Sequence, residues 1–233
     1  MLRSFSAADI VALQDIETRA WHQKPGECGE AAPEKGATGS TTLGDAPRVE
    51  AKLDSVWLAL AARQHRANCD LWHIEDEART PDATDAELAD VKRRVDKTNQ
   101  LRNDLVEELD RTLLGWLQGS GLPNPDAPLH SESPGLIVDR LSILALKIYH
   151  TREETERGNA PPGHAGRNRE RLDILEEQRA DLAACLDALW GETLDGTRRF
   201  KLYRQMKMYN DPTLNPAIYG KPFKKQGSRS TSR

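Results

Sequence analysis

The chain has 233 residues, of which 37% are hydrophobic and 30% charged, and its formal net charge at pH 7 is −4. This length suits one domain with tails and supplies enough apolar material for a hydrophobic core. The apolar run at residues 141–149 is too short and too interrupted to cross a bilayer, so no membrane insertion is expected. Residues 1–20 lack the apolar stretch of a secretory signal, and three isolated cysteines lack zinc-site spacing. We therefore expect a cytoplasmic protein.

The first 47 residues predict a helix followed by a linker. Residues 1–23 combine a helix start at Ser6 with apolar residues at helical spacing, which predicts an N-terminal helix. Residues 24–47 contain five glycines and three prolines. Such a segment cannot bury enough apolar surface to offset its ordering entropy, so we expect a flexible linker.

Helical periodicity continues through a predicted bundle domain at residues 48–220. A capping box from Thr84 to Glu87, a Ser133-Pro134 start and a C-cap at Gly191 mark helix ends. No stretch alternates with period two, so strands are not predicted. The fold class is all-α, an antiparallel helical bundle of about five main helices with a short basic C-terminal helix. After the N-terminal helix, the predicted helices span about 48–79, 84–119, 134–157, 167–190 and, for the short one, 197–208.

Polar residues interrupt the apolar stripes of the three helices predicted at 48–79, 84–119 and 134–157, and Asn103, Asp104 and Glu107 lie on the face next to one stripe. Burying unpaired charges costs several kcal/mol each, so these residues should pair with one another, with a ligand or with water. We expect them to converge on one polar centre, either as a structural network that fixes helix register or as a ligand site. A third interpretation is that the helices are rotated differently about their axes and some of these residues face solvent. They are His65, Asn68, Glu75, Asp76, Arg79, Asn99, Arg102, Asn103, Asp104, Glu107, Asp139, Arg140 and Lys147.

The residue types suggest a division of roles for a ligand site. Paired carboxylates on antiparallel helices suit Mg²⁺ or Mn²⁺, and guanidinium groups suit phosphate oxygens. The predicted metal ligands are Glu75, Asp76, Asp104 and Glu107, and the predicted catalytic groups are His65, Glu75, Asp76 and Asp104. The predicted ligand contacts are Asn68, Arg79, Asn99, Arg102, Asn103, Asp139, Arg140 and Lys147. His73 shares a helix face with Asp76, but two residues are weak evidence for a metal.

Charge is distributed unevenly along the chain. Residues 197–233 contain ten Lys or Arg and one acidic residue, so the rest of the chain is strongly acidic. We expect residues 221–233 to be a disordered basic tail. Nucleic-acid binding is disfavoured because the whole chain is acidic and carries no nucleic-acid-binding motif.

Four segments in order resemble one bacterial family, the one catalogued as domain of unknown function forty-two fifty-four. They are 65–79 (HRANCDLWHIEDEAR), 99–104 (NQLRND), 134–150 (PGLIVDRLSILALKIYH) and 208–212 (MYNDP). The resemblance covers roughly residues 50–220. It implies no agreed reaction and no established catalytic residue, and it implies genes located near those of polysaccharide assembly.

Two hypotheses from different classes follow. In the first, the polar centre is a pocket for an anionic, phosphorylated small molecule, with metal-assisted hydrolysis or group transfer as its reaction class. In the second, the protein is a non-catalytic accessory of glycan or secondary-metabolite assembly. Its polar network is then purely structural and its surface binds a protein of the glycan pathway. The sequence predicts neither the substrate nor the oligomeric state.

Overall fold

The computed structural model describes residues 6–23, 46–206 and 214, with side chains from residue 55 onward in the second range. Contacts divide the chain into two units, 1–202 and 203–233, and the helices described below belong to the first. The linker predicted at 24–47 lies outside the described residues except for its last two positions. The tail predicted at 221–233 lies outside them completely.

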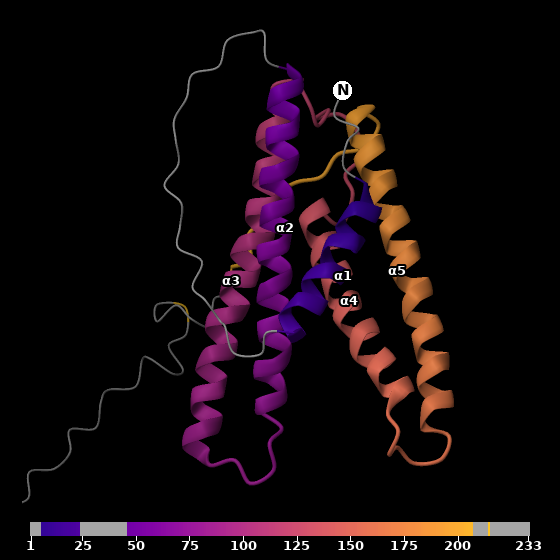
Figure 1. The fold of residues 1–233 in the computed structure, drawn as a ribbon. Helices are drawn as coiled ribbons and strands as arrows, with labels where there is room; N and C mark the ends of the chain where they lie inside the picture. The colour runs from indigo at the N-terminus through magenta and orange to yellow at the C-terminus, as the bar shows by residue number, and fades with distance from the viewer. Residues whose placement is uncertain (1–5, 24–45, 207–213, 215–233) are drawn as a thin grey trace, which may run out of the picture. The chain divides into compact units, whose positions relative to one another are not determined.

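The first unit is an all-α bundle, which confirms the predicted fold class. Its helices are α1 (Ala7–Gln23), α2 (Ala46–Glu77), α3 (Asp85–Gln118), α4 (Pro134–Glu156) and α5 (His164–Leu194). They form two hairpins, α2 with α3 and α4 with α5, and extensive contacts join the two helices of each hairpin (Figure 1). The N-terminal helix α1 crosses between the hairpins and contacts α2, α4 and α5.

Side chains from all five helices form the hydrophobic core. Each helix contributes aliphatic residues of its apolar stripe, and burial of these side chains is the main favourable term in folding. Fully or almost fully buried examples are Ile10, Trp57, Leu109, Leu113, Ile137, Leu141 and Leu186. Among the described residues, no helix is both long enough and apolar enough to span a membrane.

Local capping chemistry sets two of the helix starts as predicted. The Thr84 hydroxyl accepts a hydrogen bond from the backbone N–H of Glu87, and the Glu87 carboxylate accepts one from the backbone N–H of Thr84, so α3 begins with a complete capping box. Ser133 caps α4 by accepting from the N–H of Leu136 at 3.4 Å.

The start of α4 also packs very closely on α3. The backbone N–H of Gly135 donates to the Asp110 carboxylate at 2.7 Å, and the Ser133 hydroxyl donates to the same carboxylate. A Cβ atom at Gly135 would lie 2.7 Å from the carbonyl oxygen of Val106, so only glycine fits there. Burial raises the pKa of Asp110 to about 6, although the two hydrogen bonds oppose this shift.

Two predictions about the C-terminal part are wrong. Helix α5 starts at His164 and passes through Gly191 to Leu194, because the buried residues Trp190 and Thr193 extend its packed face beyond the glycine. The turn with positive φ comes later, at Gly196. The second difference is that residues 197–206 form no helix.

Residues 196–200 instead pair with the loop that precedes α4. The backbone N–H of His130 donates to the carbonyl of Arg199 at 2.8 Å, and the N–H of Arg199 donates to the carbonyl of Pro128 at 3.1 Å. Phe200 is buried in the core next to this contact. The backbone groups of residue 199 are therefore used between segments, where a helix would use them internally.

Candidate functional site: a buried polar network beneath a groove

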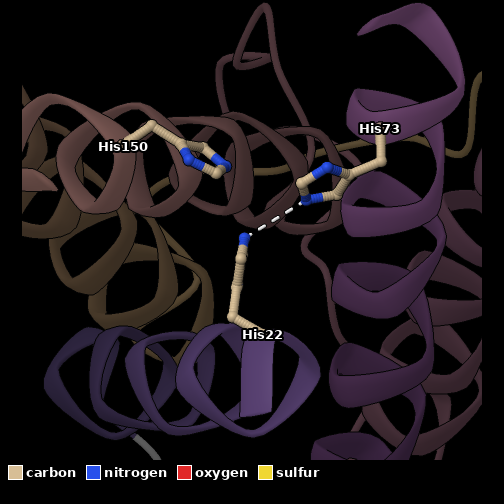
Figure 2. A group of neighbouring side chains, drawn as sticks. All are labelled: His22, His73 and His150. Carbon is tan, nitrogen blue, oxygen red and sulfur yellow. Dashed lines mark hydrogen bonds between the residues drawn. The ribbon is translucent and has the colours of Figure 1, made fainter. Parts of the chain in front are cut away.

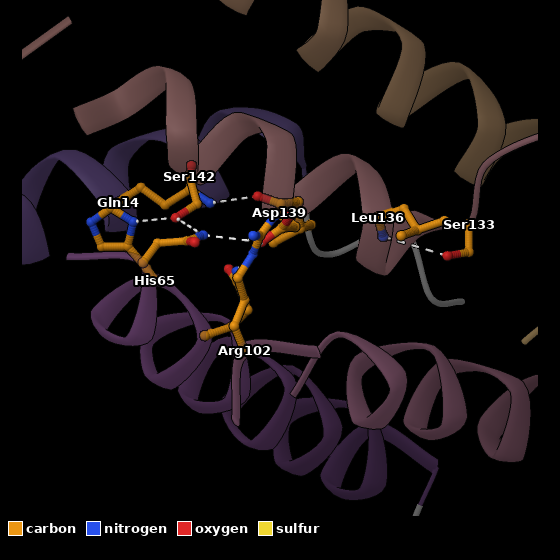
Figure 3. A network of polar contacts seen from close by, with 10 residues as sticks. Gln14, His65, Arg102, Ser133, Leu136, Asp139 and Ser142 are labelled. Atoms are coloured by element: carbon orange, nitrogen blue, oxygen red, sulfur yellow. Dashed lines mark hydrogen bonds and ion pairs between the residues drawn. The ribbon is translucent and has the colours of Figure 1, made fainter. Parts of the chain in front are cut away.

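A buried carboxylate joins three helices at the centre of the bundle. Asp139 of α4, with a side chain 8% exposed, accepts hydrogen bonds from Gln64 at 2.6 Å and Asn68 at 3.0 Å, both on α2. It also accepts from Arg102 of α3, whose Nε lies 2.7 Å from Oδ1 and whose Nη2 donates to Oδ2 (Figure 3). The charge of Asp139 is thus neutralised by a two-point ion pair.

His65 continues the network away from Asp139. Thr18 donates its hydroxyl proton to the carbonyl of Gln14 at 2.8 Å, so its oxygen accepts from His65 Nε2, also 2.8 Å away. His65 Nδ1 then accepts from the hydroxyl of Ser142 at 2.8 Å (Figure 3). The Ser142 oxygen in turn accepts from Asn68 at 2.9 Å. Each hydroxyl donates once and accepts once, so the proton positions are determined along the chain of contacts.

The environment of His65 keeps its imidazole neutral. Burial, with a smaller contribution from the charge of Arg66, lowers the pKa of His65 to about 4. The side chain is fully buried and both ring nitrogens are already hydrogen-bonded. This geometry gives His65 a structural position between α1, α2 and α4. The Cys69 thiol lies 3.5 Å from its Nε2, and burial raises the pKa of that thiol to about 12.

A groove of about 350 Å³ lies between α2, α3 and α4, next to Asp139 and its partners. Five of the residues predicted to form a ligand site line it, on a partly apolar surface. We call this space the Arg102 groove. Its lining residues are Asn68, Leu71, Trp72, Glu75, Asp76, Arg79, Arg102, Ile143 and Leu146.

The charged groups at the mouth of the Arg102 groove are exposed and loosely paired. Arg79 Nη1 lies 3.5 Å from a carboxylate oxygen of Asp76, and Nη2 lies 3.9 Å from one of Glu75. All three side chains are about half exposed or more, so these ion pairs contribute little to stability. Arg79 Nη1 also donates to the backbone carbonyl of Glu75 at 2.5 Å, so a ligand could displace the ion pairs at small energetic cost while this hydrogen bond stays.

The predicted metal ligands do not come together. Asp104 is exposed and accepts a hydrogen bond from Gln100 at 2.7 Å. Glu107 lies 3.8 Å from Arg111 of its own helix. Within the described residues, no three carboxylates place oxygens within 4.8 Å of one another, so Glu75 and Asp76 at the groove form no site with Asp104 and Glu107. Asn99 and Asn103 are half-buried and do not line the Arg102 groove.

Two further predicted contacts lie in a different groove, of about 650 Å³, on the side of α4 that faces α5. Arg140 pairs there with Glu132 at 2.7 Å, and Lys147 is exposed. The polar residues therefore do not meet at one centre, because Arg140 follows Asp139 directly and adjacent helical residues point in different directions.

Three histidines that are far apart in the sequence lie together at the crossing of α1, α2 and α4 (Figure 2). They are His22, His73 and His150, one from each helix (Figure 2). In the sequence, His73 shares a helix face with Asp76, and no pattern links it to His22 or His150. No spacing within one helix could reveal the group, because its members come from three separate segments.

Comparison with known proteins places the chain in a family. The family model described as "Protein of unknown function (DUF4254)" matches residues 58–202, well over half of the chain, so the chain belongs to this family, as its motifs predicted. None of the curated proteins and none of the solved structures matches the chain.

Proposed function

We propose that this member of the DUF4254 family binds a phosphorylated small molecule in the Arg102 groove, together with Mg²⁺ or Mn²⁺. The observation that supports this proposal is the position of Arg102. Its Nε and Nη2 are held by Asp139, while its side chain also lines the groove. Within the described residues, no acceptor takes the protons of Nη1, which leaves this edge of the guanidinium for a ligand oxygen.

The buried partners of Arg102 make it a preorganised contact. Gln64 and Asn68 donate to the same carboxylate, so the guanidinium is held from behind by a fixed acceptor. A side chain fixed in this way loses little conformational entropy when a ligand binds. Arg79, at the exposed mouth, would supply the second cationic contact.

The balance of charge in the Arg102 groove favours a phosphate with its metal over a bare anion. Two carboxylates, Glu75 and Asp76, accompany the two guanidinium groups. Mg²⁺ is commonly held by one or two carboxylates, substrate phosphates and water. The carboxylates would then contact the metal and the arginines would contact phosphate oxygens. Metal-assisted hydrolysis or group transfer is the reaction class that suits such an arrangement.

Thermal unfolding with defined ligands tests the proposal. The protein is melted with Mg²⁺ alone and with Mg²⁺ plus phosphate, pyrophosphate, a nucleotide or a nucleotide sugar. A ligand that binds only the folded protein raises the free energy of unfolding, by about 2.7 kcal/mol at a hundredfold excess over Kd, and therefore raises Tm. The expected result is an increase with a phosphorylated compound and Mg²⁺ that is greater than the increase with either alone.

A matched pair of variants assigns the effect to the groove. Arg79→Gln should weaken binding at least about tenfold, because a charge-assisted hydrogen bond is lost. Arg63→Gln, an exposed position on the same helix outside the groove, should not. Equal ligand-induced shifts in both variants, or no shift with any compound, would rule out this site.

The second function, a non-catalytic accessory role in glycan or secondary-metabolite assembly, is favoured by the network itself. Asp139 and His65 have their polar atoms engaged by protein groups, as expected of a network that fixes helix register. Co-purification of a glycan-pathway enzyme without any effect of ligands on Tm would support this function.

A further inference from the structure

We propose that His22, His73 and His150 form a binding site for a divalent transition-metal ion of the Zn²⁺ class. One nitrogen from each ring lies within 4.8 Å of the other two (Figure 2). This site is separate from the Arg102 groove. Trp72 lies between the two, since it lines the groove and also stacks on His150.

The hydrogen bonds of His22 direct a lone pair toward the other rings. His22 Nδ1 lies 2.7 Å from the backbone carbonyl of Thr18. A carbonyl can only accept, so Nδ1 carries the proton and neutral His22 has its lone pair on Nε2. That nitrogen lies 3.2 Å from His73 Nε2.

His150 is oriented in the same way from the opposite side. Its Nδ1 lies 3.0 Å from the Glu153 carboxylate, which accepts the Nδ1 proton and leaves the lone pair on Nε2. Within the described residues this Nε2 is buried and has no hydrogen-bond partner. A buried polar atom without a partner is costly, and a metal ion would satisfy it.

Both contacts follow the pattern found around histidines that bind metals. Such histidines donate their second ring N–H to a carboxylate, a backbone carbonyl or water, which fixes the tautomer and makes the ligating nitrogen more basic. Thr18 supplies the carbonyl for His22, and Glu153 supplies the carboxylate for His150. Without metal, His73 Nε2 donates its proton to His22. With metal, Nε2 gives up that proton while Nδ1 takes one up, so His73 stays neutral and Nε2 becomes a ligand.

Metal binding would require the three imidazole nitrogens to move only a small distance toward one another. Three nitrogens bound at 2.0–2.1 Å to a tetrahedral Zn²⁺ lie about 3.3 Å apart. The His22–His73 pair is already at 3.2 Å, and the other separations reach at most 4.8 Å. Rotation of the half-buried His150 ring toward its neighbours would complete the group.

Aromatic rings and acidic groups surround the three histidines. Trp21 stacks on His73 with ring centroids 4.2 Å apart, and Tyr149 stacks on His22 at 4.3 Å. These rings limit how far the imidazoles can turn. Burial and the neighbouring His22 and His150 lower the pKa of His73, and the charges of Asp76 and Asp70 oppose this shift.

The ligand set determines the class of metal. Imidazole suits Zn²⁺, Cu²⁺, Ni²⁺ and iron, whereas Mg²⁺ and Mn²⁺ prefer oxygen. Three protein ligands with one open position are typical of catalytic zinc sites, in which the fourth ligand is water or substrate.

Titration of the chelator-treated full chain with Co²⁺ and Zn²⁺ tests the site. The expected result is one equivalent of Co²⁺ with the visible absorption of a four-coordinate centre, displaced by Zn²⁺, and a Zn²⁺-dependent increase in Tm. His150→Gln should weaken Zn²⁺ binding at least tenfold, whereas His130→Gln, which changes a histidine outside the cluster, should not. Glu153→Ala, which removes the acceptor of the His150 Nδ1 proton, should weaken binding about 10- to 100-fold without removing a ligand.

Absence of Co²⁺ absorption and of any Zn²⁺ effect in the folded protein would overturn the proposal, as would equal Zn²⁺ affinity in His150→Gln and His130→Gln. Because Glu153 is exposed, its variant should fold even if His150→Gln does not, and unchanged affinity in Glu153→Ala would contradict the proposed orientation of His150. Arg79→Gln should retain Zn²⁺ binding, so failure of this site and failure of the phosphate site can be distinguished.

Discussion

Arg102 of α3 and Asp139 of α4 meet through two parallel hydrogen bonds, with Nε 2.7 Å from Oδ1 and Nη2 donating to Oδ2. The pair joins the two hairpins of the bundle. Its carboxylate side is buried and its guanidinium side is 23% exposed, at the Arg102 groove. The same contact therefore bears on stability and on the proposed ligand site.

Removing one member of this pair should destabilise the protein strongly. Arg102→Met leaves the buried Asp139 carboxylate without its cation, and breaking a buried pair costs about 3–5 kcal/mol. Urea unfolding measures this loss. The double variant Arg102→Met with Asp139→Leu should be more stable than Arg102→Met alone, because no unpaired charge remains. A loss below about 1 kcal/mol in the single variant would show that the pair is dispensable.

Gly135 and Gly191 should respond to alanine in opposite directions. At Gly135 the new Cβ would lie 2.7 Å from the carbonyl oxygen of Val106, and such crowding costs about 1–3 kcal/mol. At Gly191, inside α5, nothing lies within 4 Å, so the better helix propensity of alanine should stabilise by up to about 1 kcal/mol. Thermal unfolding of the two variants checks both signs. Equal destabilisation would contradict the close packing of α4 on α3.

Stability should depend on pH through His65. Its pKa is about 4 when folded and 6.5 when unfolded, so between these values the unfolded chain binds a proton that the folded protein does not. The free energy of unfolding should therefore fall as pH decreases from 6.5 to 4, by roughly 3 kcal/mol from this group. Above pH 6.5 the group contributes no pH dependence.

Comparison with His65→Gln isolates this contribution. Asp110, with a raised pKa of about 6, has the opposite effect between pH 4 and 6, but it is present in both proteins and cancels in their difference. The stability advantage of the protein over His65→Gln should shrink as pH falls. Parallel pH profiles from urea unfolding would show that His65 is not held neutral.

Two aspartates should respond differently in the ligand assay. Asp76→Asn, at the Arg102 groove, should reduce the Tm increase given by Mg²⁺ and a phosphorylated compound, because one proposed metal ligand is lost. Asp104→Asn should leave it unchanged, because that carboxylate is exposed on α3 and contacts Gln100. Equal losses in both variants would favour the four-carboxylate site that the sequence alone suggested.

Features that depend on neighbouring residues were predictable from the sequence. The capping box at Thr84 and the Ser133-Pro134 start of α4 are determined within a few residues, and both are confirmed. Gly191 was misleading as a helix end, because glycine inside a helix costs only about 1 kcal/mol relative to alanine. Burial of Trp190 and Thr193 around it offsets that cost.

The sites were less predictable because they depend on how the helices rotate about their axes. Arg102 and Asp104 are two positions apart and cannot face the same neighbour in a helix. Polar residues in the apolar stripes of three helices suggested one polar centre, whereas the structure separates the Arg102 groove from the groove beside Arg140. The histidine cluster requires the packing of three helices, which no pattern within a single segment reveals.

The pairing of Leu129 with Arg199 gives the second hairpin a closed connection. Helices α4 and α5 are linked through the backbone at residues 157–163 and through hydrogen bonds between strand-like segments at their other ends. Limited proteolysis after the exposed Arg157 would accordingly produce a nicked protein whose two fragments stay associated.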